Sequence, residues 1–84
     1  MLVTTSQLSH RDRAILKAVA AGRAELSCSC EPDLFVDGLS CCDQAAARAL
    51  THAGYIAPCM SSTAGRRVPA QITAAGTAAL AVSA

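Results

Sequence analysis

Apolar residues recur at helical spacing near the start of the chain. Between residues 9 and 21, Ile15, Leu16 and Val19 fall within one arc when successive residues are placed 100° apart, and Lys17 falls opposite. This pattern predicts an amphipathic helix with one face on the core and a basic face in water.

Residues 41–53 have a second helical pattern, in which most side chains are small. The side chains predicted to point inward are Cys42, Ala45, Ala46, Ala49, Leu50 and Ala53. Those predicted to point outward are Gln44, Ala47, Arg48 and Thr51. The outward set is small, polar and free of acids, which suits a helix that lies in a groove lined with phosphates.

Both predicted helices begin with a capping pattern and end at a glycine. Ser9 with Asp12, and Ser40 with Asp43, place a hydroxyl at the helix head and an acid three residues later. The hydroxyl accepts hydrogen bonds from free backbone amides, and the acid lies near the positive end of the helix dipole. The glycines that end the two helices are Gly22 and Gly54.

Three further stretches favour extended structure. Residues 23–30 alternate roughly between apolar and polar, which predicts a short strand. Residues 55–60 and 67–73 predict two strands around a turn-rich tip, and Pro69 predicts that the returning strand lies at a sheet edge. We expect the first strand to join this hairpin as a third member.

Residues 32–38 predict a short helix, because Pro32 suits a first helical turn and Gly38 ends the segment. The three β-favouring residues 34–36 leave an extended turn open as the alternative. At the other end of the chain, Thr73 caps a predicted helix without any charge. Such a helix is expected to pack on the body of the protein or on a partner chain.

These elements predict an α+β fold with three to four helices and a small antiparallel sheet. The 84 residues have room for one domain, at residues 9–84, after an N-terminal arm at residues 1–8. A domain of this size has a thin stability margin, so we expect a homodimer.

Charge is divided unevenly along the chain. The net charge is +1, but all six acids lie before residue 44, and the remainder carries Arg48, Arg66 and Arg67 without any acid. Any surface that faces an anion is therefore expected in the second half.

Several classes of function and location are disfavoured. Residues 1–10 lack a secretory pattern and no apolar run has membrane-spanning length, so we expect a cytoplasmic protein without a membrane partner. A glycine-rich phosphate loop, a serine elbow and paired acids are missing from the sequence, and His10 and His52 lack a partner at helical spacing. We therefore expect no enzyme and no cofactor. One lysine against six arginines suggests a GC-rich bacterial or phage genome.

Two segments, ARALTHAGYI and RRVPAQITAAGTAAL, each join a helix to an extended stretch. The first resembles the end of the recognition helix running into the wing of winged helix-turn-helix proteins. The second resembles the return strand of that wing followed by an L-T-x-x-G-x-x-x-L helix start. Bacterial regulators of the MarR and PadR types are the most similar members, and the order of predicted elements from residue 9 to 82 follows theirs.

The resemblance implies a transcriptional regulator that binds double-stranded DNA. Helix 41–53 would enter the major groove, and wing 57–72 would lie along the backbone or minor groove. Glutamine and arginine on the helix would pair with adenine and guanine, and the helix head would take a phosphate. The implied DNA-binding residues are Ser40, Gln44, Arg48, Thr51, Arg66 and Arg67.

The five cysteines leave three interpretations open. Plain buried thiols are one, because cysteine is among the most buried residue types. A zinc ion or iron–sulfur cluster is the second, with the candidate ligands Cys28, Cys30, Cys41 and Cys42. Redox sensing is the third, with Cys41 at a helix head as the best candidate.

Two other functions remain as alternatives to DNA binding. The protein could be an interaction module on a winged scaffold that docks a host or phage protein through its alanine-rich end and residues 34–36. It could instead be a metal or redox switch. Binding that weakens steeply with salt distinguishes a DNA reader from an apolar docking module.

Overall fold

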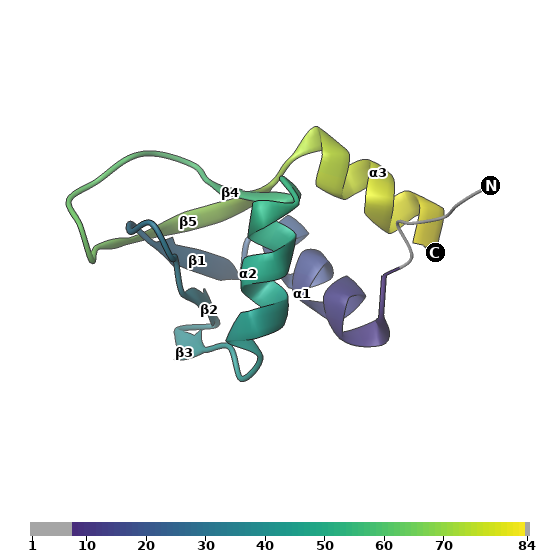
Figure 1. Cartoon of the computed structure of the whole chain (residues 1–84), viewed down its shortest axis with the longest axis horizontal. Coiled ribbons are helices and arrows are strands. Elements are labelled where there is room, and N and C mark those ends of the chain that lie inside the picture. The colour runs from purple at the N-terminus through teal and green to yellow at the C-terminus, as the bar shows by residue number, and fades with distance from the viewer. Residues whose placement is uncertain (1–7, 84) are drawn as a thin grey trace.

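The computed structural model of the protein describes residues 8–83. The predicted N-terminal arm lies outside the described residues except for Leu8. The elements in chain order are α1 His10–Ala20, β1 Ala24–Ser27, β2 Leu34–Val36, β3 Leu39–Ser40, α2 Gln44–His52, β4 Ile56–Pro58, β5 Arg67–Ile72 and α3 Ala74–Ser83. The strands form one antiparallel sheet in the order β3-β2-β1-β5-β4 (Figure 1). The α+β class is confirmed, with three helices in the described chain.

Helix α1 confirms the first predicted helix and its cap. The side chain of Ser9 accepts from the backbone N–H of Asp12, and the carboxylate of Asp12 accepts from the N–H of Ser9. Ile15, Leu16 and Val19 are buried, as the apolar arc predicted. The helix ends at Ala20, before Gly22 with its positive φ of 80°.

The short helix predicted at residues 32–38 is wrong. This segment contains β2, which pairs with β1, and the two-residue turn that leads into β3. Asp37 and Gly38 occupy the turn with φ values of 54° and 83°, so both have the left-handed conformation of a type I′ hairpin. An Asp-Gly pair after three β-favouring residues is the sequence signal for such a hairpin.

The sheet has one face on the core and one face open. On the inner face, alternate residues of β1 and β5 are buried, namely Ala24, Leu26, Val68 and Ala70. Ala24, Leu26 and Ala70 join one core cluster with side chains of α1 and α2, and Leu80 of α3 packs against it. The intervening residues define the outer face, and they are Glu25, Ser27, Phe35, Arg67, Pro69 and Gln71. None of them belongs to the core cluster of the described chain, so the helices cover the inner face only.

Strands β4 and β5 confirm the hairpin predicted in the second half, and β1 joins it as predicted. The position of β5 is not the predicted one, because it lies between β1 and β4 rather than at an edge. Pro69 is tolerated there because it lies opposite Cys59, one residue beyond the end of β4. Its carbonyl accepts the N–H of Cys59 at 2.9 Å, so the bond lost through its missing N–H falls at the end of the ladder.

Helix α2 begins three residues later than predicted. Ser40 is part of β3 and pairs with Phe35, so it does not cap the helix. The cap is Asp43, whose carboxylate accepts from the N–H of Ala46 at 2.9 Å. The predicted capping box of Ser40 and Asp43 is therefore wrong, because Ser40 belongs to the β2–β3 hairpin.

The faces of α2 also differ from the prediction. Leu50 is buried as expected, but Ala47, predicted to face solvent, is only 1% exposed. Ala45, Ala49 and Ala53, predicted to point inward, are exposed. Because α2 has so many alanines, the periodicity only weakly indicates which side of the helix faces the core. The larger side chain of Leu50 and the contact with β2 determine that side.

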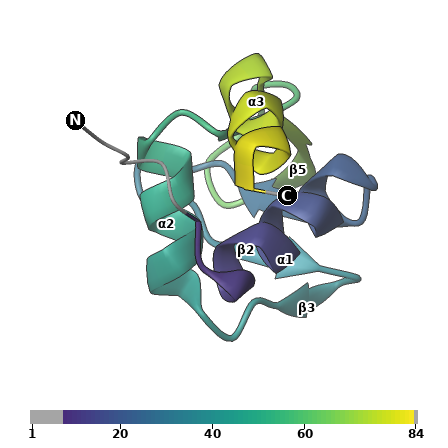
Figure 2. The same cartoon turned by 90° about the vertical axis from the view of Figure 1, so that its right-hand side faces the viewer.

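Helix α3 is held at its start by Thr73. The hydroxyl of Thr73 donates to the carbonyl of Gly54 at 2.6 Å and accepts from the N–H of Gly76 at 3.0 Å. Figure 2 shows α3 lying above α1, with α2 beside α1. No helix among residues 8–83 is both long and apolar enough to cross a membrane.

Gly76 lets α3 approach the chain that follows α2. A Cβ at this position would collide with the carbonyl oxygen of Tyr55 and lie 2.8 Å from Cγ1 of Ile72. We expect Gly76→Ala to lower the free energy of unfolding by roughly 1–3 kcal/mol, as overpacking does. Urea denaturation measures this, with the exposed neighbour Ala75→Ser as the control. Equal midpoints for the two variants would mean that this close approach does not exist.

Candidate nucleic-acid interface

The side chain of Gln44 is used within the protein. Its Oε1 accepts the N–H of Leu34 at 2.9 Å, and its Nε2 donates to the carbonyls of Leu34 and Cys41, both at 2.9 Å. These bonds occupy the amide edge that would have paired with adenine. In this structure Gln44 joins α2 to β2, and base reading by Gln44 would require these bonds to break.

Arg48 lies between two carboxylates of the segment before β2. Its Nη2 donates to Asp33 at 2.8 Å, and its Nε lies 3.7 Å from Oε1 of Glu31. The side chain is 39% exposed, so part of it remains open to solvent. His52, one turn later, lies 4.0 Å from the other oxygen of Glu31. In this arrangement the carboxylates balance the positive charge of Arg48.

Thr51 and Ser40 also have other roles than predicted. Thr51 is partly buried and its hydroxyl donates to the carbonyl of Ala47 at 2.9 Å. Ser40 lies in β3, away from the head of α2, which is occupied by the carboxylate of Asp43. The predicted position of Ser40 at this helix head is wrong, because Asp43 caps the helix and its carboxylate would repel a phosphate there.

The head of α2 is an ion-paired cap. Asp43 accepts from the N–H of Ala46 and from Nη1 of Arg11, the latter at 2.7 Å. The backbone bond first, and then the guanidinium, hold the pKa of Asp43 below its ordinary value of 3.8. A similar pair, at 2.7 Å, joins Arg23, just before β1, to Asp37 in the β2–β3 turn, and the hydrogen bond to Arg23 lowers the pKa of Asp37.

Arg66 and Arg67 differ from Arg11, Arg23 and Arg48 in that neither forms an ion pair with an acid in the described part of the chain. Both are exposed. The backbone of Arg66 is fixed, since its carbonyl accepts from Cys28 at 2.8 Å and its N–H donates to Thr63 at 3.0 Å. The guanidinium carbon of Arg67 lies 4.4 Å from the centre of the Phe35 ring.

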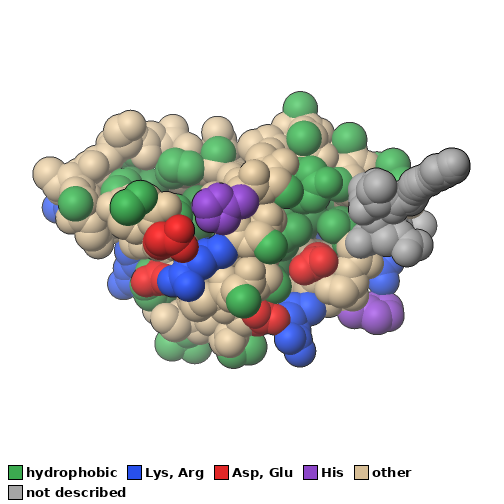
Figure 3. Space-filling model, in the orientation of Figure 1, with side chains coloured by type: hydrophobic (Ala, Val, Ile, Leu, Met, Phe, Trp, Pro, Cys, Tyr) green, Lys and Arg blue, Asp and Glu red, His purple; other side chains and the backbone are tan. Residues whose placement is uncertain are grey.

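Arg48 of the predicted helix and Arg67 of the predicted wing do not share one surface. Arg67 and Phe35 lie on the outer face of the sheet, whereas α2 packs on the inner face through Ala47 and Leu50. On the side seen in Figure 3, lysine and arginine side chains lie beside aspartate and glutamate, and they form no extended basic patch there. Arg48 and Arg67 thus face opposite sides of the sheet.

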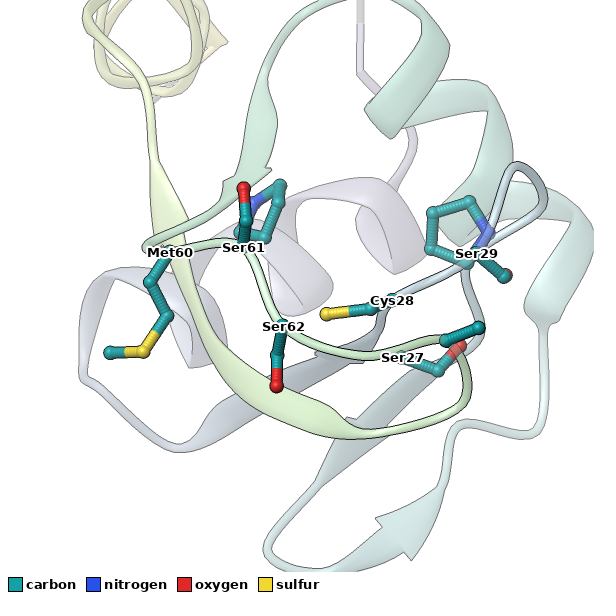
Figure 4. Close-up of a pocket in the computed structure, with 9 residues that line it drawn as sticks. Ser27, Cys28, Ser29, Met60, Ser61 and Ser62 are labelled. Atoms are coloured by element: carbon teal, nitrogen blue, oxygen red, sulfur yellow. The ribbon is translucent and has the colours of Figure 1, made fainter.

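A pocket of about 320 Å³ lies under the hairpin loop, which we define as residues 59–66. Figure 4 shows the sulfur of Cys28 pointing into the space beside this loop. The pocket is lined by Ser27, Cys28, Ser29, Pro32, Pro58, Met60, Ser61, Ser62 and Ala64. The polar side chains that line the pocket are serine hydroxyls and one thiol, and none of the lining side chains is charged. The sequence pointed only to a turn here, because two loops far apart in the chain form the pocket.

All five cysteines are free thiols. Within residues 8–83, no group of three or more histidine, cysteine, aspartate or glutamate residues could hold a metal ion. The structure therefore does not bring the candidate ligands Cys28, Cys30, Cys41 and Cys42 together. Cys41 is also three residues ahead of α2, so it lacks the helix-head position on which the redox interpretation relied.

Comparisons with models of protein families, with curated proteins and with solved structures find no match to this chain.

The bonds of Gln44 lead to a stability prediction. Gln44→Ala leaves the N–H of the fully buried Leu34 without its acceptor, so we expect roughly 1–3 kcal/mol of destabilisation. Urea unfolding followed by circular dichroism measures the change. The control is Gln71→Ala, an exposed glutamine on β5. A loss no larger than that of the control would contradict the role of Gln44.

The cap of α2 leads to a prediction on pH. Because the folded-state pKa of Asp43 lies below 3.8, its ionised form stabilises the fold above that pH, and this contribution is lost as pH falls through the lowered value. Asp43→Asn keeps a capping oxygen but removes the charge. We expect the variant to be less stable than the wild type at about pH 7 and equal to it near pH 2. A gap in urea midpoint that is unchanged across this range would refute the ion-paired cap.

Proposed function

We propose that the protein is a DNA-binding transcriptional regulator of the winged helix-turn-helix type. In this proposal the β2–β3 hairpin takes the position of the second helix. Support comes from the order α1, β1, α2, β4, β5 and α3, and from the placement of β5 between β1 and β4. The Thr73 cap before Gly76 also agrees with the segment that resembles the wing and the following helix.

The observation that carries the proposal is the pair Arg66 and Arg67 at the end of the hairpin loop. Their charges are not neutralised by an acid of residues 8–83, unlike those of Arg11, Arg23 and Arg48. A backbone fixed to Cys28 reduces the entropy lost when Arg66 contacts a phosphate. Contacts with phosphate supply most of the affinity of weak, sequence-tolerant DNA binding.

Helix α2 has a smaller part in this proposal than the sequence indicated. Its solvent side carries Ala45, Ala49 and His52, so it offers close approach to DNA but few donors for base edges. Arg48 would contact DNA only by leaving Asp33 and Glu31. We therefore propose that the hairpin loop dominates binding and that sequence preference is low.

A second copy of the chain would strengthen such binding. Two arginines per chain give a small electrostatic contribution, and a homodimer doubles it on one duplex. The dimer and the cytoplasmic location expected from the sequence belong to the same proposal.

A protein-interaction module is the second candidate. It is favoured by the exposed face of α3, which carries no charge and ends at Val82, 75% exposed. Leu39 is also 73% exposed at the β2–β3 turn. Of the segment predicted to dock, however, Leu34 is fully buried, so residues 34–36 do not form a docking patch as a unit.

The DNA proposal is tested with Arg66→Ala. Fluorescence anisotropy with a labelled duplex of random sequence, roughly 20 base pairs long, should show weaker binding at low salt. The slope of log affinity against log salt should fall in magnitude by about one, because one phosphate contact is lost. The matched control is Arg23→Ala, whose arginine is paired with Asp37 and should matter little. Unchanged duplex affinity in Arg66→Ala would refute the proposed contact, and binding of a partner that is insensitive to salt would favour the interaction module.

A further inference from the structure

The outer face of the sheet holds the one phenylalanine of the chain. Phe35 alternates with the buried residue Leu34, so its ring points away from the core that the helices cover. The ring is partly buried, although no helix lies on this face. An aromatic side chain that would contribute strongly to a core built from small residues is thus placed outside it.

Arg67 reaches this ring across a strand. Strand β1 separates β5 from β2, and Arg67 lies opposite Ser27 whereas Phe35 lies opposite Glu25. The guanidinium carbon is 4.4 Å from the ring centre, within the range of a cation–π interaction. The guanidinium lies over the ring, so the pair combines an aromatic ring with a positive charge on the open face.

The surroundings of this pair favour one class of ligand. An unstacked nucleic-acid base binds to aromatic rings and guanidinium planes by stacking, and a duplex keeps its bases stacked inside. Arg66 precedes Arg67 and is available for the phosphate of the same strand, because no described acid neutralises it. Glu25 lies directly opposite Phe35 and keeps phosphate away from the centre of the face. Its carboxylate is an acceptor for the amino group of a cytosine.

We propose that the outer face binds single-stranded nucleic acid, with one base stacked on Phe35 and Arg67. This inference goes beyond duplex binding, since α2 lies on the other face of the sheet. The base stacks on the planar pair, the neighbouring phosphate contacts Arg66, and exposed Gln71 and Ser40 flank the strand. The pair of Phe35 and Arg67 is the only cation–π pair among residues 8–83, so the site accommodates a short stretch of nucleic acid.

The test uses labelled twelve-residue oligocytidines, one DNA and one RNA, in anisotropy titrations with the full chain. Phe35→Leu keeps an apolar side chain but removes the ring, and Arg67→Lys keeps the charge but removes the plane. Each should weaken binding about tenfold, the size of one lost base stack. Phe35→Tyr keeps the ring and should bind within about twofold of the wild type. Circular dichroism establishes that each variant is folded.

Duplex binding separates this inference from the proposed function. Phe35→Leu should leave the affinity for duplex unchanged, whereas Arg66→Ala should weaken both kinds of binding. Tighter binding of one oligocytidine identifies DNA or RNA as the natural ligand and supports the site either way. Equal binding of oligocytidine by the wild type and Phe35→Leu, or no binding by the wild type, overturns the inference. If Phe35→Leu and Phe35→Tyr lose affinity equally, the ring does not stack a base and the inference also fails.

Discussion

The bonds between the Gln44 side chain and the backbone of Leu34 determine how the two halves of the molecule meet. One amide satisfies both the N–H and the carbonyl of a residue that is fully buried. The carbonyl also accepts from the N–H of Cys41, just after β3, but β3 is too short to give the buried N–H an acceptor, and Gln44 supplies it. Helix α2 is therefore fixed against β2, and this contact orients the helix so that Ala47 and Leu50 point toward the core.

The other properties of the surface follow from this arrangement. Because α2 packs against β2, Arg48 lies beside Glu31 and Asp33, which precede β2. These carboxylates balance its charge, so the helix does not present the basic side that the sequence predicted. Arg66 and Arg67, on the β4–β5 hairpin, form no ion pair with a described acid. The sheet, extended by the β2–β3 hairpin, presents an outer face with an aromatic ring and a guanidinium in contact. The available chemistry is thus concentrated on strands and a loop rather than on a helix.

The sequence was sufficient to predict an element where an interaction between nearby residues determines its structure. The caps at Ser9 and Thr73 depend on bonds between residues three apart, and both are found as predicted. The strands β1, β4 and β5 followed from short alternating stretches between turn residues. The β2–β3 hairpin was not predicted, because Pro32 also suits the first turn of a helix. The signal for the hairpin is the Asp37–Gly38 pair, which adopts the left-handed conformation that a type I′ turn requires.

The candidate site could not be predicted in the same way, because it depends on contacts between distant segments. The partners of Arg48 lie 15 and 17 residues earlier in the chain, and no periodicity connects them. The ring of Phe35 and the guanidinium of Arg67 are neighbours only because β1 lies between their strands. The face of α2 was predicted wrongly because alanines contribute almost equally on every side.

Hydrogen exchange at the Leu34 amide tests the central claim most directly, because this N–H is bound to a side chain of α2 and not to a neighbouring strand. If Gln44 fixes α2 on β2, this amide should exchange as slowly as those of the buried strands in the wild-type protein. An amide at Leu34 that exchanges as fast as those of the hairpin loop would show that α2 is not held there, and that its polar side chains remain free to contact DNA.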